Sequence, residues 1–162
     1  MPYPNIQIGV NPAPLGLTGL PSWFWLQGYD GRPFGAGAHI DVPPRVPSSY
    51  PAGCPQPPGA SLDVAVQFAS SSFDWAFGDR LTTSTLSTTS LGKPYPQQSD
   101  IRHTYEYTSL GQPNGFAVSV TVHFHAQYQA NGGRWLAMPD VAKTYSREYQ
   151  VQQAQSVLVN GR

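Results

Sequence analysis

The chain has little charge of either sign. Only 11% of its 162 residues are charged, and the nine basic residues balance the nine acidic ones. An average soluble domain has about 25% charged residues. This balance excludes the basic field that attracts nucleic acid and the polybasic run that binds a membrane surface. No apolar run approaches the roughly 20 residues of a membrane-spanning helix. We therefore expect no nucleic acid among the partners and no membrane span.

Cysteine is scarce as well, because Cys54 is the only one. A single cysteine excludes a disulfide within the chain and a zinc site made of cysteines. Cys54 lies in a Pro-rich segment, where the preferred interpretation is an inert small residue. A disulfide to another chain is the alternative if the protein is exported and Cys54 is exposed.

A recognisable signal peptide is also missing. The first residues, Met1-Pro2-Tyr3-Pro4, lead directly into polar and strand-like sequence. The protein is therefore either cytosolic or exported with its signal removed. Low charge and abundant Pro, Thr, Ser, Gln and Tyr favour export. We predict an extracellular or cell-surface location.

Common catalytic motifs are absent from the sequence. Neither Gly-x-Ser-x-Gly nor His-Glu-x-x-His occurs in the sequence. Cys54 has no evident histidine partner, and nothing among the nine acidic residues selects a pair for glycoside hydrolysis. The sequence predicts a protein that is not an enzyme.

Acidic residues near the middle of the chain could bind calcium, a cation that prefers several carboxylate and carbonyl oxygens. They are Asp74, Asp79, Asp100 and Glu106, with His103 among them. Their spacing does not match Asp-x-Asp-x-Asp-Gly, and aspartates in turns commonly accept hydrogen bonds from local backbone. We predict no cofactor, and calcium is the alternative.

Turn-forming residues, by contrast, are abundant. The 16 Gly and 17 Pro make up about a fifth of the chain, and both residues disfavour helix interiors. Residues 28–60 hold eight of these Pro and six of these Gly and show no periodicity. We expect a stiff Pro/Gly-rich loop there that wraps the surface, with a short strand possible only over residues 38–42.

Between the turns, alternating polar and apolar residues predict strands. The predicted strands cover residues 5–10, 19–26, 62–68 and 73–77, with a turn at 70–72, and residues 144–159 form one or two returning strands. Residues 81–90, with eight Ser or Thr, predict an exposed loop or edge strand, and O-glycosylation is the alternative. Asn131-Gly132-Gly133 predicts a hairpin turn. No segment has helical periodicity, so the predicted fold class is all-β.

The longest alternation runs from Phe116 to Tyr128 and predicts a strand with one core face and one solvated face. His123 and His125 lie two residues apart on the solvated face, a spacing that would allow a shared metal ion. No third ligand is evident. Two solvent-facing histidines are the preferred interpretation.

Tryptophans suggest a second kind of site. Trp23 and Trp25 fall on one face of a predicted strand whose other face is also apolar, and core packing is the preferred interpretation. The alternative is a sugar-stacking platform, which would require exposed indoles. Its candidate ligand contacts are Trp23, Trp25 and Trp135.

One central stretch resembles the PKD domain family. Trp75-Ala76-Phe77-Gly78-Asp79, then His103-Thr104-Tyr105, then the strand from Phe116 follow the family's order of W-D-F-G-D-G, H-x-Y and Y-x-V-x-L-x-V. The similarity covers about residues 60–130. Ala76 and Arg80 replace the usual Asp and Gly, and a longer loop at 108–115 replaces the usual Pro-Gly.

The resemblance implies one domain over residues 1–162, an immunoglobulin-like antiparallel β-sandwich with long loops. The flanking segments look like those of exported bacterial proteins that embed a PKD-like core. Six residues carry structural roles in this interpretation. Trp75 and Phe77 would pack in the core, Gly78 would take a positive φ and Asp79 would accept backbone N–H groups in the turn. Tyr105 would act as a corner residue with its hydroxyl on backbone, and His103 would bond backbone nearby.

The predicted function is therefore a non-enzymatic, extracellular structural or adhesive module of a bacterial cell-surface or filament assembly. Its predicted partners are proteins, and self-association is possible in this interpretation. The alternative is a carbohydrate-binding module that uses exposed Trp and Tyr side chains. The Pro-rich segment, the Ser/Thr-rich segment and the N-terminal strand are the candidate contact elements.

Overall fold

The computed structural model describes residues 3–44, 59–80 and 84–153, and these residues form strands without any helix. The prediction of an all-β fold is therefore confirmed. Within these ranges there is accordingly no helix that could cross a membrane. Cys54 and the C-terminal residues from 154 onward, for which predictions were made, lie outside the described part.

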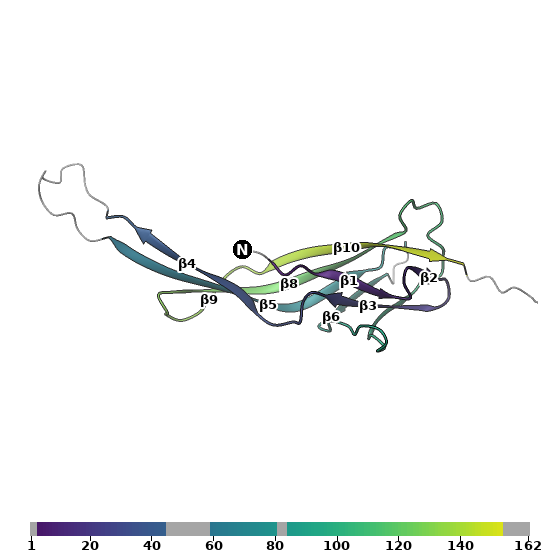
Figure 1. Cartoon of the computed structure of the whole chain (residues 1–162), viewed down its shortest axis with the longest axis horizontal. Coiled ribbons are helices and arrows are strands. Elements are labelled where there is room, and N and C mark those ends of the chain that lie inside the picture. The colour runs from purple at the N-terminus through teal and green to yellow at the C-terminus, as the bar shows by residue number, and fades with distance from the viewer. Residues whose placement is uncertain (1–2, 45–58, 81–83, 154–162) are drawn as a thin grey trace, which may run out of the picture.

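The described residues form ten strands in two sheets (Figure 1). The smaller sheet has three strands in the order β1 (Gln7–Asn11), β3 (Pro21–Gln27) and β7 (Ile101–Thr104). The larger sheet has the order β2 (Leu15–Leu17), β10 (Val141–Gln152), β8 (Phe116–Ala130), β5 (Ala60–Ala76) and β4 (Phe34–Val42). Two short strands complete it: β6 (Thr85–Thr88) pairs with β5, and β9 (Leu136–Ala137) pairs with β8.

The core lies between the two sheets and follows from the alternation of β8. Val118, Val120, Val122 and Phe124 are fully buried, each separated from the next by a residue of the opposite face. From the smaller sheet, the ring of Phe24 lies 5.1 to 6.1 Å from the rings of Trp75 and Tyr149 of the larger one and of Phe77, just beyond the end of β5. Aromatic pairs at these distances contribute about 0.5–1.5 kcal/mol each beyond their burial. The smaller sheet thus covers one face of the larger sheet.

The turn predicted at residues 70–72 is wrong. β5 runs without a break from Ala60 to Ala76, and the three serines contain a register shift between Ser70 and Ser72 in its pairing with β8. The hydroxyl of the extra residue, Ser71, donates to the carbonyl of His123 at 3.2 Å. A bulge of this kind adds one residue to one strand and bends it. It explains why the alternation changes phase there.

The prediction of purely antiparallel pairing is also wrong at one edge. β2 runs parallel to β10, with Gly16 opposite Val151. The phenol of Tyr149 on β10 donates to the carbonyl of Pro12 at 2.9 Å. Ser22 Oγ lies 3.1 Å from the same phenol oxygen. These contacts connect the first strands of the chain to the last described one.

The most extensive departure concerns residues 28–60, where the sequence predicts a loop with at most a short strand over residues 38–42. Nine of these residues form β4, which pairs antiparallel with the first half of β5 from Phe34 opposite Phe68 to Val42 opposite Ala60. Residues 45–58 lie outside the described part. The paired ends of β4 and β5 extend away from the body of the molecule (Figure 1). We call this projecting pair, residues 36–42 and 60–66, the arm.

Candidate functional site

The PKD-like motif lies at a buried corner between the sheets. Trp75 and Phe77 are each 1% exposed and sit on the core face, and Gly78 has a φ of 81°. The ring of Tyr105 is fully buried, and its hydroxyl donates to the carbonyl of Phe77 at 2.9 Å. Burial raises the pKa of Tyr105 well above its ordinary value, so the phenol stays protonated and keeps donating. Gly78 is required because a Cβ at this position would lie 2.5 Å from the carbonyl oxygen of Ala117.

Two roles predicted at this corner are wrong. His103 bonds a side chain rather than backbone: its Nε2 lies 2.6 Å from Asp79 Oδ2. Asp79 is therefore the partner of His103, and its other oxygen has no hydrogen-bond partner among the described residues. The imidazole also stacks on Phe77, with ring centres 4.5 Å apart and planes 3° from parallel. Aromatic packing fixes the ring direction, which brings the two polar groups together.

The three tryptophans predicted as ligand contacts do not form a platform. Trp25 is 8% exposed because it lies across Gly9, its partner on β1, where any Cβ would overlap the indole. Trp23 is half-buried on the same strand. Trp135 is 41% exposed and lies by the larger sheet, just before β9. A flat row of three exposed indoles is therefore not present.

Every histidine of the chain forms a pair with an aspartate. In addition to the buried pair, His123 Nε2 lies 2.7 Å from Asp74 Oδ2 and His125 Nδ1 lies 2.8 Å from Asp140 Oδ1. His123 and His125 thus have different partners and do not converge on one point. The hydroxyl of Ser87 donates to Asp74, and this bond, with His123, holds the pKa of Asp74 below its usual value.

The acidic residues considered for calcium are dispersed. Asp100 accepts a hydrogen bond from Ser90, whereas Asp74 and Asp79 belong to two different histidine pairs. Over residues 3–44, 59–80 and 84–153, no three His, Cys, Asp or Glu side chains are grouped closely enough to hold a metal ion.

The face of the larger sheet opposite the core is polar and open. Directly opposite partners show which residues share it: His39 faces Asp63, Ala65 faces Gln129 and Ala69 faces His125. Between them, Gln127 donates to Gln67 at 2.8 Å. Three of the four histidine pairs lie on this solvated face.

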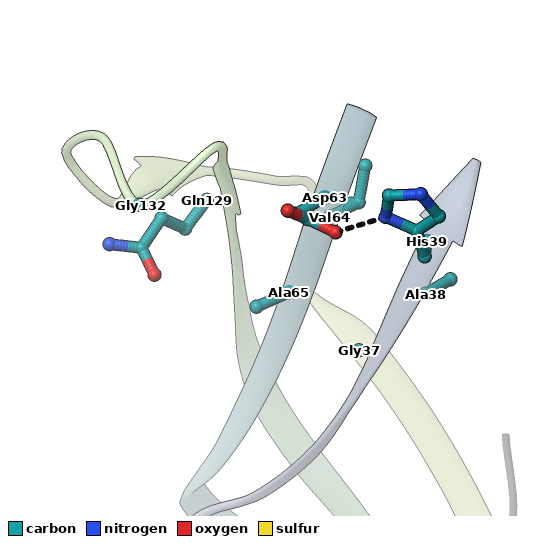
Figure 2. Close-up of a pocket in the computed structure, with 8 residues that line it drawn as sticks. All are labelled: Gly37, Ala38, His39, Asp63, Val64, Ala65, Gln129 and Gly132. Atoms are coloured by element: carbon teal, nitrogen blue, oxygen red, sulfur yellow. Dashed lines mark hydrogen bonds and ion pairs between the residues drawn. The ribbon is translucent and has the colours of Figure 1, made fainter. Parts of the chain in front are cut away.

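Small residues make a hollow of about 320 Å³ on the arm (Figure 2). Gly37 and Ala65 line it without side chains large enough to fill it. Figure 2 shows His39 of β4 and Asp63 of β5 joined at one side, with Gln129 and Gly132 on the far side of Ala65. The His39 Nδ1 to Asp63 Oδ1 distance is 2.5 Å, and Asp63 also receives the backbone N–H of Asn131 on its carbonyl at 2.7 Å.

The pH response of the arm follows from this pair. Its hydrogen bond and the charge of Asp63 raise the pKa of His39 above 6.5. The stabilisation that the His39–Asp63 pair gives the folded protein is complete below the pKa of His39 in the unfolded chain. It is lost as the pH rises through the higher pKa of His39 in the folded protein. In an NMR titration we expect His39 to titrate above its ordinary value and Asp63→Asn to return it towards that value. Asp41→Asn is the control and should have a smaller effect, because Asp41 is the weaker contributor. Titration of wild-type His39 at or below 6.5 would contradict this assignment.

A second hollow, of about 420 Å³, lies beside Trp135. Its lining combines the exposed indole with Gln127 and the His125–Asp140 pair, and Ala69 leaves room at its base. An aromatic ring beside neutral and acidic hydrogen-bonding groups is suited to polar, uncharged ligands.

Comparison with known proteins adds no relative. No family model matches the chain, and searches of curated proteins and of solved structures found no match.

Sequence reasoning predicted a strand over residues 62–68 and allowed a short one over 38–42, but it missed the full length of β4, its pairing with β5, the hollow and the histidine–aspartate pairs. A signal for the arm was present, because Gly35, Gly37, His39 and Asp41 alternate with apolar residues in the otherwise irregular segment. The high Gly content concealed it, since Gly is depleted in strands. Except for the His39–Asp41 contact, the paired residues are separated by 15 to 49 positions in the sequence. No local pattern therefore reveals them.

Proposed function

We propose that this fold is an immunoglobulin-like sandwich of the PKD type. The partition of the strands supports this assignment: β1, β3 and β7 form one sheet, while β5, β8 and β10 lie together in the other. In chain order this corresponds to the A-B-E and C-F-G sets of that fold. The bond from the Tyr105 hydroxyl to backbone is a further point of support, since a corner tyrosine is a feature of such domains. β4 and the short strands β2, β6 and β9 are additions to this core.

We further propose that the protein is a non-enzymatic, extracellular structural or adhesive module that contacts other proteins in a cell-surface or filament assembly. One observation carries the proposal: β4 is an edge strand of nine residues, eight of them exposed. Natural proteins usually protect such an edge with a Lys, a Pro, a bulge or a very short strand. β4 contains no Lys and no Pro, and its pairing with β5 has no register shift.

Apolar surface on the arm supports the same function. Ile40 and Val42 are each 46% exposed, and Leu62 and Val64 of β5 lie opposite Ile40 and Ala38 on the same face. Clustered exposed apolar residues mark surfaces that contact protein or another apolar partner. The solvated face, in contrast, carries paired polar groups, among them His123 with Asp74 and His125 with Asp140.

Beads coated with the protein test this function, because many weak contacts act together on a bead. We expect wild-type beads to cluster and beads that carry Ile40→Lys with Val42→Lys to remain dispersed. Beads with Trp135→Ala are the control and should cluster like wild type. Wild-type beads that stay dispersed, or clusters that a panel of soluble glycans dissolves, would overturn the proposal.

Carbohydrate binding is the second candidate, and the hollow beside Trp135 is the observation that favours it. Stacking of a sugar on the indole would change its fluorescence. Titration with a glycan panel should then change the emission of wild type and leave that of Trp135→Ala unchanged. An identical response of the two proteins would exclude this hollow as the binding site.

A further inference from the structure

We propose that β4 pairs edge to edge with β4 of a second copy of this chain, antiparallel, with Ala38 on the twofold axis. The two larger sheets would then join into one continuous sheet. This inference rests on the proposed function and names its partner: the contact surface is the free edge of the arm, and the contact is with the same surface of another molecule.

Among the strands that end the two sheets, β4 has the longest free edge. At the ends of the two sheets lie β1 with five residues, β7 with four, β2 with three and β4 with nine. Residues 141–149 of β10 also have β8 as their one strand partner among the described residues, but there Tyr145 and Arg147 donate hydrogen bonds to the carbonyls of Pro4 and Ile8 in the N-terminal segment. Within the described part of the chain, β4 has β5 as its one neighbour. Alternate backbone N–H and C=O groups therefore face outward along its other side, and such a row is a template for another strand.

Symmetry restricts the register of a self-pairing. A twofold axis normal to the sheet keeps each face of β4 on the same side in both copies, so a residue must lie on the axis rather than between two residues. The strand runs from Phe34 to Val42, and its midpoint is Ala38. Centring on Ala38 is therefore the register that pairs all nine residues and leaves Pro43 outside the ladder.

Side-chain size is complementary in this register. Ile40 lies opposite Ala36 of the second copy, and Val42 lies opposite Phe34, so the apolar residues meet on one face. On the other face His39 lies opposite Gly37 and Asp41 opposite Gly35. Like charges directly opposite each other would be unfavourable, and this register places no two like charges opposite each other. Gly35, Ala36 and Gly37 thus leave room for the larger side chains opposite them, and Phe34 makes an apolar contact with Val42.

A strand from a different protein is a less favourable partner for the free edge of β4. The outward side chains of β4 are mostly small or apolar, and its one His and one Asp are already paired with each other and with Asp63. The edge therefore lacks an unpaired charge with which to select a charged partner, whereas its own sequence places small residues 35–37 opposite the larger residues 39–41.

Disulfide trapping tests the register. In a Cys54→Ser background, Ala38→Cys places two thiols on the axis, where facing residues of an antiparallel pair have Cα atoms about 4.5–5.5 Å apart, as a disulfide requires. Asp41→Cys is the matched control on the same exposed strand, because its two copies would be separated by roughly 20 Å in this register. Under mild oxidation we expect Ala38→Cys to form covalent dimers roughly tenfold faster or more than Asp41→Cys.

Sedimentation of chains without added cysteine provides the second measurement. Ala38→Lys would place two ammonium groups together on the axis, and we expect it to weaken dimerisation roughly tenfold or more. Ser61→Lys adds the same charge to an exposed residue of β5, away from the free edge, and should dimerise like wild type. Circular dichroism confirms that each variant is folded.

The outcomes separate this inference from the proposed function. Rapid trapping at residue 38, with weakened dimers of Ala38→Lys, supports the pairing. Bead clustering that depends on the arm, without preferential trapping at residue 38, would overturn the pairing and leave the contact function standing. If the protein stays monomeric at the highest concentrations and coated beads do not cluster, both the pairing and the contact function would be overturned.

Discussion

Replacing Trp75 with alanine should lower the free energy of unfolding by about 3–5 kcal/mol, the cost of truncating a large buried aromatic side chain. Trp75 is 1% exposed and is packed from two directions. Its ring centre lies 6.1 Å from that of Phe24 on the smaller sheet and 6.3 Å from that of Phe77 beyond the end of β5. Removing the indole would therefore leave a cavity where the two sheets meet.

Urea denaturation followed by circular dichroism measures this effect. Trp135→Ala is the matched control, since it removes the same side chain from a site that is 41% exposed, and we expect a change below about 1 kcal/mol. Equal losses in the two variants would contradict the assignment of Trp75 as the residue that holds the sheets together.

Replacing Asp79 with alanine should cost about 3 kcal/mol, the upper end of the range for leaving a buried hydrogen-bonding group without its partner. The side chains of Asp79 and His103 are only 4% and 9% exposed. Without the carboxylate, the imidazole would lose its one hydrogen bond among the described residues and would remain buried against Phe77 and Tyr105. The penalty arises from that unpaired buried group rather than from the loss of attraction alone.

Asp140→Ala is the matched control for this prediction. Asp140 pairs with His125 at a similar distance, 2.8 Å, but the two side chains are 60% and 68% exposed. Exposed pairs of this kind contribute about 0–1 kcal/mol, so the variant should unfold nearly like wild type. Combining His103→Ala with Asp79→Ala should cost less than the sum of the two single changes, because the second removes the group that the first leaves unpaired. A sum that is simply additive would show that the pair does not act as a unit.

Parts of this fold could be predicted from the strict alternation of apolar and polar residues in the sequence. Along β8 each second residue is apolar, and the structure buries that set and leaves His125 of the other set exposed. At Asn131 and Gly132 the backbone takes positive φ values of 48° and 67°, as the predicted hairpin turn needs. In both cases the information is local, because neighbouring residues determine the period or the turn.

Long-range packing decided the features that could not be predicted. Trp25 is buried because Gly9 of the neighbouring strand leaves space for an indole, and nothing near Trp25 in the sequence reveals that register. His103 finds Asp79 across 24 positions through the stacking of its ring on Phe77. β4 lacks the β-branched residues that favour strands over most of its length, and pairing with β5 determines its conformation instead.

Hydrogen exchange along β4 tests the central claim, that the free edge of the arm is the contact surface. Exchange of the amides of residues 34–42 should be measured at a low and a high protein concentration, with the edge strand β1 as the internal reference. We predict that exchange of the β4 amides slows roughly tenfold or more as the concentration rises, while exchange of the β1 amides does not change. Exchange along β4 that is equally fast at both concentrations would contradict it.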